Sequence, residues 1–216
     1  SLYDNGSQRE NFLHLFVLLT LIGAWVNTYI FNPTKDKYYA LILLGMDAKE
    51  YALVTYGYEL LKVLVAYLVF GLIFGSMRGL PVWQCLMLPF AAAGTKITVV
   101  AYSLWDYERT GIAVNENQVG VMVWILIGLG LAAAYGLPVL GWSIPEMVSV
   151  ALLAWGILLG VMSMRKVWTF QEYREVYQQL LTQHMSQLEE VKGAAKRQSE
   201  KVIQIDSEAG SSRKGF

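Results

Sequence analysis

The chain has few of the residues that build metal sites and disulfide frameworks. Among its 216 residues there is one cysteine, Cys85, and there are two histidines, His14 and His184. A lone cysteine excludes an intramolecular disulfide and any paired-cysteine metal motif. The histidines lie in different regions and no H-E-x-x-H sequence occurs. We therefore expect no bound metal and no metalloprotease chemistry.

The chain also lacks the residues of a nucleotide-hydrolysing enzyme. It contains no G-x-x-x-x-G-K-[ST] phosphate loop. The nearest sequence, Gly94-Thr95-Lys96, has no earlier glycine at the required spacing and lies in an apolar stretch. Basic residues in the tail are interleaved with Glu189, Glu190 and Glu200, which argues against a nucleic-acid partner. We expect this chain to bind no cofactor and to carry no catalytic residues.

Apolar sequence, in contrast, is abundant. Hydrophobic residues make up 55% of the chain, and the mean hydropathy is +0.40. The long apolar stretches approach the roughly 20 residues that a helix needs to cross a bilayer core of about 30 Å. Backbone N–H and C=O groups without hydrogen-bond partners are not tolerated in hydrocarbon, so such stretches form helices. The predicted fold is all-α, a polytopic transmembrane helix bundle. Its five predicted spans are residues 12–31, 52–74, 80–104, 119–140 and 147–164.

Capping boxes precede four of these stretches. In a capping box, an N-cap side chain and a Glu or Gln three residues later satisfy each other's backbone N–H groups. The third span begins instead at Gly79-Leu80-Pro81, where proline suits a first helical turn. The four boxes are Ser7 with Glu10, Asp47 with Glu50, Asn115 with Gln118, and Ser143 with Glu146.

Basic residues are concentrated on alternate loops. One side has only Arg9 and Arg78. The other side has Lys35, Lys37, Lys49, Arg109, Arg165 and Lys166. The positive-inside rule places the amino end outside and the carboxyl tail in the cytoplasm. Residues 1–11 have no basic signal-peptide region, so we expect one further span upstream in a longer protein.

The loop after the first span contains a short apolar segment, residues 34–46. Asn32-Pro33 ends the preceding helix, and Asp47 is expected to cap the next one. The segment is too short to span a membrane but apolar enough to lie at its interface or on a partner. A helix that transmits motion from a soluble partner and one that rests on lipid remain equally open, because amphipathicity does not identify the bound surface.

Glu59 and Lys96 are the main ionisable residues deep within the predicted spans. At 1.5 Å per residue both lie roughly 12–14 Å from the cytoplasmic border. We expect an intramembrane pair, which would remove much of the ~2.5–3.5 kcal/mol cost of a central charge. The alternative is that both side chains snorkel separately. A functional pair would act as a hinge or line a substrate path.

Two glycine motifs, Gly71-x-x-x-Gly75 and Gly156-x-x-x-Gly160, predict close helix packing. We expect that packing within the bundle, with a dimer face as the alternative. After Arg165 the chain becomes more polar, so residues 1–168 are the predicted transmembrane domain. Residues 169–216 are predicted to form a cytoplasmic amphipathic helix followed by a Ser- and Gly-rich linker.

The segments Asn32-Pro-Thr-Lys-Asp-Lys-Tyr-Tyr-Ala40 and Gly45-Met-Asp-Ala-Lys-Glu-Tyr51 resemble a group of ABC exporter permeases from Gram-positive bacteria. The tail, from Tyr173-Arg-Glu-Val-Tyr177 through Ser211-Ser-Arg-Lys-Gly-Phe216, is similar to the cytoplasmic segment before that group's second membrane half. In type-2 ABC exporters the loop between the second and third spans carries a coupling helix that contacts the ATPase. One upstream span would put residues 34–46 at that position.

The resemblance implies a permease in the bacterial plasma membrane, as five spans of a six-span half. ATP would be bound by a separate ABC ATPase subunit, and a second permease half or copy would complete the path. The runner-up function is a non-transporting membrane scaffold or regulator, and an intramembrane enzyme is a third. Few polar groups in the spans favour a peptide, lipid-like or other amphipathic cargo over an ion. The implied ATPase-coupling residues are Lys35, Asp36, Lys37, Tyr38, Tyr39, Met46, Asp47, Lys49 and Glu50.

Overall fold

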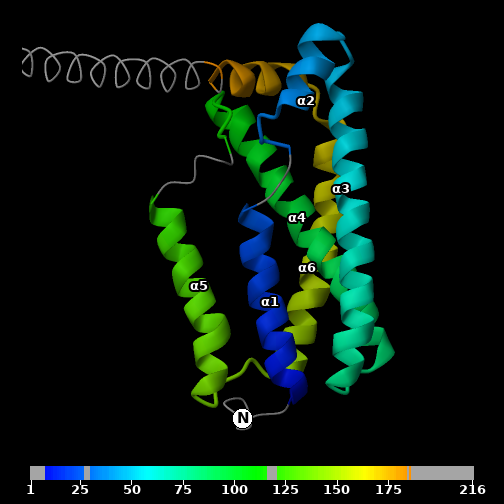
Figure 1. The fold of residues 1–216 in the computed structure, drawn as a ribbon, viewed down its shortest axis with the longest axis vertical. Coiled ribbons are helices and arrows are strands. Elements are labelled where there is room, and N and C mark those ends of the chain that lie inside the picture. Colours follow the sequence, from blue (N-terminus) through cyan, green and yellow to red (C-terminus); the bar gives the residue numbers. More distant parts are fainter. Residues whose placement is uncertain (1–7, 27–29, 116–120, 184, 186–216) are drawn as a thin grey trace, which may run out of the picture.

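The computed structural model describes residues 8–26, 30–115, 121–183 and 185. Within these ranges every regular element is a helix (Figure 1). A further helix, not labelled in the figure, covers residues 173–183 and is called the tail helix below. The labelled helices are α1 (Gln8–Val26), α2 (Lys35–Tyr38), α3 (Ala48–Phe70), α4 (Val82–Thr110), α5 (Val121–Val139) and α6 (Glu146–Thr169). Two π-helical turns continue α2 and α3, η1 (Tyr39–Leu43) and η2 (Gly71–Gly75).

The all-helical fold is confirmed for the described residues. In the part of the chain that the structure describes, three helices are long and apolar enough to cross a membrane: Ala48–Gly75, Val82–Thr110 and Glu146–Thr169. The predicted first span, 12–31, ends too late, because Ile30 and Phe31 lie outside any helix. Both side chains are almost fully buried in a cluster that includes the tail helix. Asn32 precedes proline and is therefore disfavoured in a helix, and the apolar residues before it pack as an irregular segment.

Long helices alternate in direction, so the loops divide between two ends of the bundle (Figure 1). α2, the carboxyl end of α4 and the tail helix lie at one end, called here the tail end. At the opposite end the Arg78 guanidinium donates to the Gln8 side chain over 3.3 Å, next to the turn between α3 and α4. The basic residues of the predicted cytoplasmic loops accordingly belong to the tail end, whereas Arg9 and Arg78 belong to the other.

α4 is the central helix. Of its 18 most apolar consecutive residues 61% are buried, against 22% for α6 and 6% for α3 with η2. It packs along α6 and also contacts α3 and α1, while α5 has α1 as its main neighbour. A helix with buried positions on several faces belongs inside a bundle. α4 therefore determines where the other helices can lie.

Glycines allow α4 and α6 to touch through their backbones. A Cβ added at Gly160 would lie 2.3 Å from the Gly94 Cα, and one added at Gly94 would lie 2.4 Å from the Gly156 carbonyl oxygen. On η2, a Cβ at Gly71 or Gly75 would meet Cys85 of α4 at 3.0 or 2.9 Å. Both predicted glycine motifs therefore pack within the bundle. Small residues at such contacts allow the close approach that drives helix association in membranes.

One of the predicted capping boxes is confirmed at its cap residue and another is wrong. The Asp47 carboxylate accepts the Glu50 N–H over 2.8 Å at the start of α3, as predicted. The box at Ser143 is wrong, because α6 begins after Pro145 without a side-chain cap. Glu146 instead accepts a 2.7 Å hydrogen bond from the Gln84 amide of α4. The boxes at Ser7 and Asn115 each include a residue outside the described ranges.

His14 connects three parts of the non-tail end. Its ring is 1% exposed, and its Nδ1 accepts the Ile144 N–H over 3.2 Å. The ring proton is therefore on Nε2, which donates to the Ala133 carbonyl, also over 3.2 Å. This neutral tautomer joins α1 to α5 and to the loop before α6. Its surroundings are those of a packed structural histidine.

The glycine contact yields a direct test of the fold. Gly160→Ala places a methyl group against the α4 backbone, which cannot move aside as a side chain would. We expect a loss of about 1–3 kcal/mol, the usual cost of overpacking a core. Gly128→Ala on α5 is the matched control, since nothing lies within 4 Å of its added Cβ. The measurement is the thermal unfolding midpoint of each variant in detergent. Equal midpoints for the two variants would contradict the proposed role of the contact between α4 and α6.

Candidate functional site

The candidate site is the loop between α1 and α3, together with the tail helix on which it lies. Thr34 caps α2 by accepting the Lys37 N–H over 3.4 Å, and η1 carries the helix on to Leu43. Gly45 then adopts a φ of +63°, a left-handed conformation that favours glycine and ends the short helix. The predicted short helix is thus present, with its helical part at residues 35–43.

Lys37 is the buried centre of this loop. It is only 4% exposed, and its ammonium group donates to the Ile30 carbonyl over 2.9 Å and the Asn32 carbonyl over 2.7 Å. The same Nζ lies 5.1 Å from the centre of the Tyr177 ring on the tail helix. A buried ammonium group needs such partners to offset its desolvation. Lys37 therefore holds the irregular chain after α1 against the tail helix.

The tail helix is an integral part of the bundle. Its inward residues Tyr173, Val176, Tyr177 and Leu180 are at most 2% exposed, and they share a core with α3, α4 and α6. The Tyr173 hydroxyl donates to the Val167 carbonyl over 2.7 Å. Burial raises the pKa of the Tyr173 phenol above its usual value, so the hydroxyl remains a donor throughout the neutral range.

Gln179 fixes the tail helix to the loop after α4. Its amide nitrogen donates to the Gly111 carbonyl over 3.1 Å, and its amide oxygen accepts the Ala113 N–H over 3.0 Å. Nearby, Lys166 of α6 forms an ion pair with Glu108 of α4. The tail end therefore ties together the loop before α3, the end of α4 and the end of α6.

The structure places the predicted coupling residues in three groups. Lys37 is buried and faces inward, whereas Tyr38 and Lys49 are partly buried. The remainder are exposed, and Asp47 is among them while it caps α3. The exposed coupling residues are Lys35, Asp36, Tyr39, Met46, Asp47 and Glu50.

An apolar surface accompanies these charges; the sequence predicted an apolar segment here, but Ile42, Leu43 and Leu44 were not among the predicted coupling residues. Ile42, Leu43 and Leu44 are 46%, 60% and 75% exposed, next to exposed Tyr39 and Met46. We call this the loop surface: Lys35, Asp36, Tyr39, residues 42–47 and Glu50. Three acidic side chains and one lysine surround its apolar residues. The signal was available in the run Ala40-Leu-Ile-Leu-Leu44, but only the fold shows which side of it is free.

Glu59 and Lys96 do not form the expected pair. The Glu59 carboxylate bonds Lys62, three residues further along α3, at 2.6 Å. Lys96 instead donates to the Gly23 carbonyl of α1 over 3.1 Å. Their depths along the helices were compatible, but Lys96 leaves α4 on the side of α1 rather than α3. The prediction was wrong because the depth of a residue along its helix does not define the direction in which its side chain points around the helix axis.

Among the described residues, no group of three or more His, Cys, Asp or Glu side chains is close enough to hold a metal ion. Comparisons of the chain with protein-family models, with curated proteins and with solved structures find no match.

The contacts of Lys37 predict that replacing this residue weakens the packing of the tail helix on the bundle. Lys37→Met retains a long stem but leaves the Ile30 and Asn32 carbonyls without their ammonium donor, at a cost of about 1–3 kcal/mol for each buried acceptor. Tryptic cleavage at Arg174 should become faster, and the unfolding temperature should fall. Lys35→Met, at an exposed position of the same helix, is the control and should change neither. Unchanged cleavage in Lys37→Met would contradict the anchoring role.

The raised pKa of Tyr173 predicts that the stability of the fold depends on pH. Burial raises its folded-state pKa above 10.0, the ordinary value of a tyrosine phenol, so folding favours the protonated form. This stability is fully present below about pH 10, the unfolded pKa, and is lost as the pH rises above it. Tyr173→Phe lacks both the hydrogen bond and the titration, and should start about 0.5–1.5 kcal/mol less stable. Unfolding midpoints of the two proteins should converge above pH 10, and parallel curves would refute the assignment.

Proposed function

We propose that this chain is the membrane-spanning permease part of an ATP-driven ABC exporter, with the loop surface as the docking site for a separate ATPase subunit. The observation that carries the proposal is the composition of the loop surface. An exposed apolar centre surrounded by charges of both signs suits a protein partner. Since the cytoplasmic leaflet is negatively charged, an excess of exposed acidic residues disfavours contact with lipid headgroups.

The contacts behind the loop surface support a mechanical role. The short helix leads into α3 through the Asp47 cap, and Lys37 holds it to the tail helix, which continues from α6. A displacement of the short helix by a closing ATPase would therefore be passed to both α3 and α6. In this mechanism the attached helices tilt and alternate access to the two sides of the membrane, while ATP hydrolysis takes place on the partner.

The topology proposed here has five spans in this chain. α1 and α5 have 19 residues each, about 28 Å at 1.5 Å per residue, which is close to the bilayer core thickness. Crossing by all five helices puts the basic tail end in the cytoplasm by the positive-inside rule. The amino end of this chain then lies outside a bacterial plasma membrane, with a second permease half or copy beside it.

Cysteine crosslinking tests the docking surface. Leu43→Cys on a Cys85→Ala background in the full-length protein should form an adduct with an ABC ATPase in native membranes. The adduct yield should change with ATP, because nucleotide-driven closure moves the partner. Leu140→Cys, 75% exposed in the turn before α6, is the control at the other end of the bundle and should form none.

Charge reversal separates a permease from a scaffold. Lys35→Glu combined with Asp36→Lys should lower nucleotide-dependent transport or partner ATPase activity at least about tenfold, a loss of about 1.4 kcal/mol of coupling. The unfolding midpoint should not change, since both residues are exposed. An unaltered activity, together with the absence of any ATPase adduct at Leu43→Cys, would reject the permease and favour a non-transporting scaffold.

A further inference from the structure

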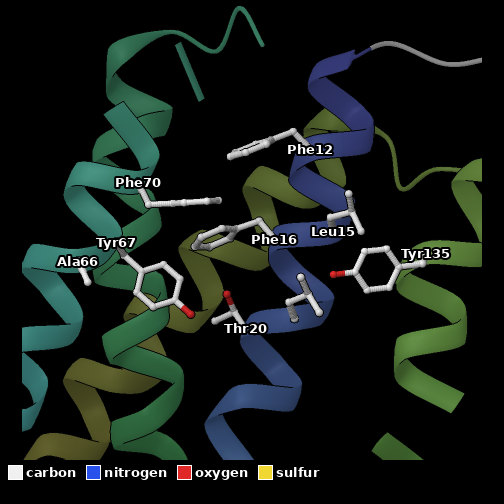
Figure 2. Close-up of a pocket in the computed structure, with 9 residues that line it drawn as sticks. Phe12, Leu15, Phe16, Thr20, Ala66, Tyr67, Phe70 and Tyr135 are labelled. Carbon is white, nitrogen blue, oxygen red and sulfur yellow. The ribbon is translucent and has the colours of Figure 1, made fainter. Parts of the chain in front are cut away.

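A cavity of about 510 Å³ opens between α1, α3 and α5, within the apolar part of the bundle (Figure 2). α1 and α3 line one side with aromatic rings: Phe12 stacks on Phe70 with centroids 5.9 Å apart, and Phe16 meets Tyr67 edge to face at 5.5 Å. Tyr135 of α5 lies across from them. The lining of the cavity contains no charged side chain. A charged ligand would find no counter-charge here, so any occupant is neutral.

One buried polar group of this cavity lacks a hydrogen-bond partner. Thr20 of α1 is 6% exposed, and its hydroxyl oxygen is buried without a hydrogen bond. Threonines in helices commonly bond a carbonyl one turn back, as Thr95 does with Ala91 over 3.0 Å and Thr98 with Gly94 over 2.9 Å. Figure 2 shows the Thr20 and Tyr67 hydroxyls both pointing into the space between α1 and α3.

We propose that this cavity binds a neutral, mainly apolar small molecule from the membrane, whose single hydroxyl or carbonyl oxygen hydrogen-bonds Thr20. The aromatic walls provide apolar contact for the body of the ligand, and the orphaned hydroxyl selects for its oxygen. The cavity volume lies in the range of about 300–1,000 Å³ that is usual for small-molecule sites. A plain hydrocarbon chain would leave Thr20 unsatisfied. This site is independent of the proposed coupling to an ATPase.

Photolabelling distinguishes such a ligand from lipid hydrocarbon. The probes are a diazirine-bearing octanol and the matching diazirine octane, applied to the full chain in lipid nanodiscs, with adducts located by mass spectrometry. The octanol probe should label α1 and α3 saturably. Thr20→Val, which is close in shape but lacks the hydroxyl, should weaken this labelling by about three- to tenfold, the effect of one hydrogen bond. Thr20→Ser should retain the binding, and the octane probe should not distinguish the variants.

A second pair of variants tests the location. Ala66→Trp should fill the cavity and abolish saturable octanol labelling, whereas Val65→Trp, at the next residue but outside the cavity lining, should preserve it. If Ala66→Trp fails to fold, the nearly isosteric Thr20 pair still decides. Equal octanol labelling of the wild type and Thr20→Val, or equal saturable labelling by both probes, would overturn the proposal and leave a groove filled by lipid chains.

Discussion

The backbone contact between α4 and α6 determines the arrangement of the other elements. At Gly94 and Gly160 there is no room for a Cβ between the two helices. Dispersion forces at this short distance act over much of both helices. In a bilayer the hydrophobic effect does not drive helices together, so such packing contacts are a main source of helix association. Once α6 is fixed on α4, the chain that leaves α6 places the tail helix across the end of α4. The loop before α3 can then pack on the tail helix.

Basic residues at the tail end serve two different purposes. Lys37 is taken out of solvent and used as an internal donor between the chain after α1 and Tyr177, so its charge contributes to the fold. Lys35, two residues earlier, is exposed. The same short sequence thus supplies an anchor and part of an outward surface. Because Lys37 is buried, acidic residues outnumber basic ones on the loop surface. The proposed docking of a protein partner, rather than of an anionic lipid surface, rests on this charge balance.

The buried polar groups of the spans illustrate how a helix bundle handles hydrogen bonding in an apolar medium. Lys96 reaches a backbone carbonyl of α1, and Glu59 is bonded by Lys62 on its own helix. His14 uses both ring nitrogens between α1, α5 and the loop before α6. Each of these groups has a partner within reach, as the low dielectric requires. Thr20 is one of the exceptions to this rule, and its hydroxyl lies in the cavity between α1, α3 and α5.

The sequence alone determined the helical class, the approximate positions of the long helices, the cap at Asp47 and the uneven distribution of basic residues between the two ends. These features follow from composition, from local periodicity and from contacts between near neighbours in the chain. Only the tertiary structure decided that Ile30 and Phe31 leave the helix, that Lys37 is buried, that Lys96 faces α1 and that Thr20 lines a cavity. Each of these depends on the rotation of a helix about its axis or on the approach of a distant segment. Such relations are set by packing across the bundle, and a stretch that is apolar on all sides carries little information about them.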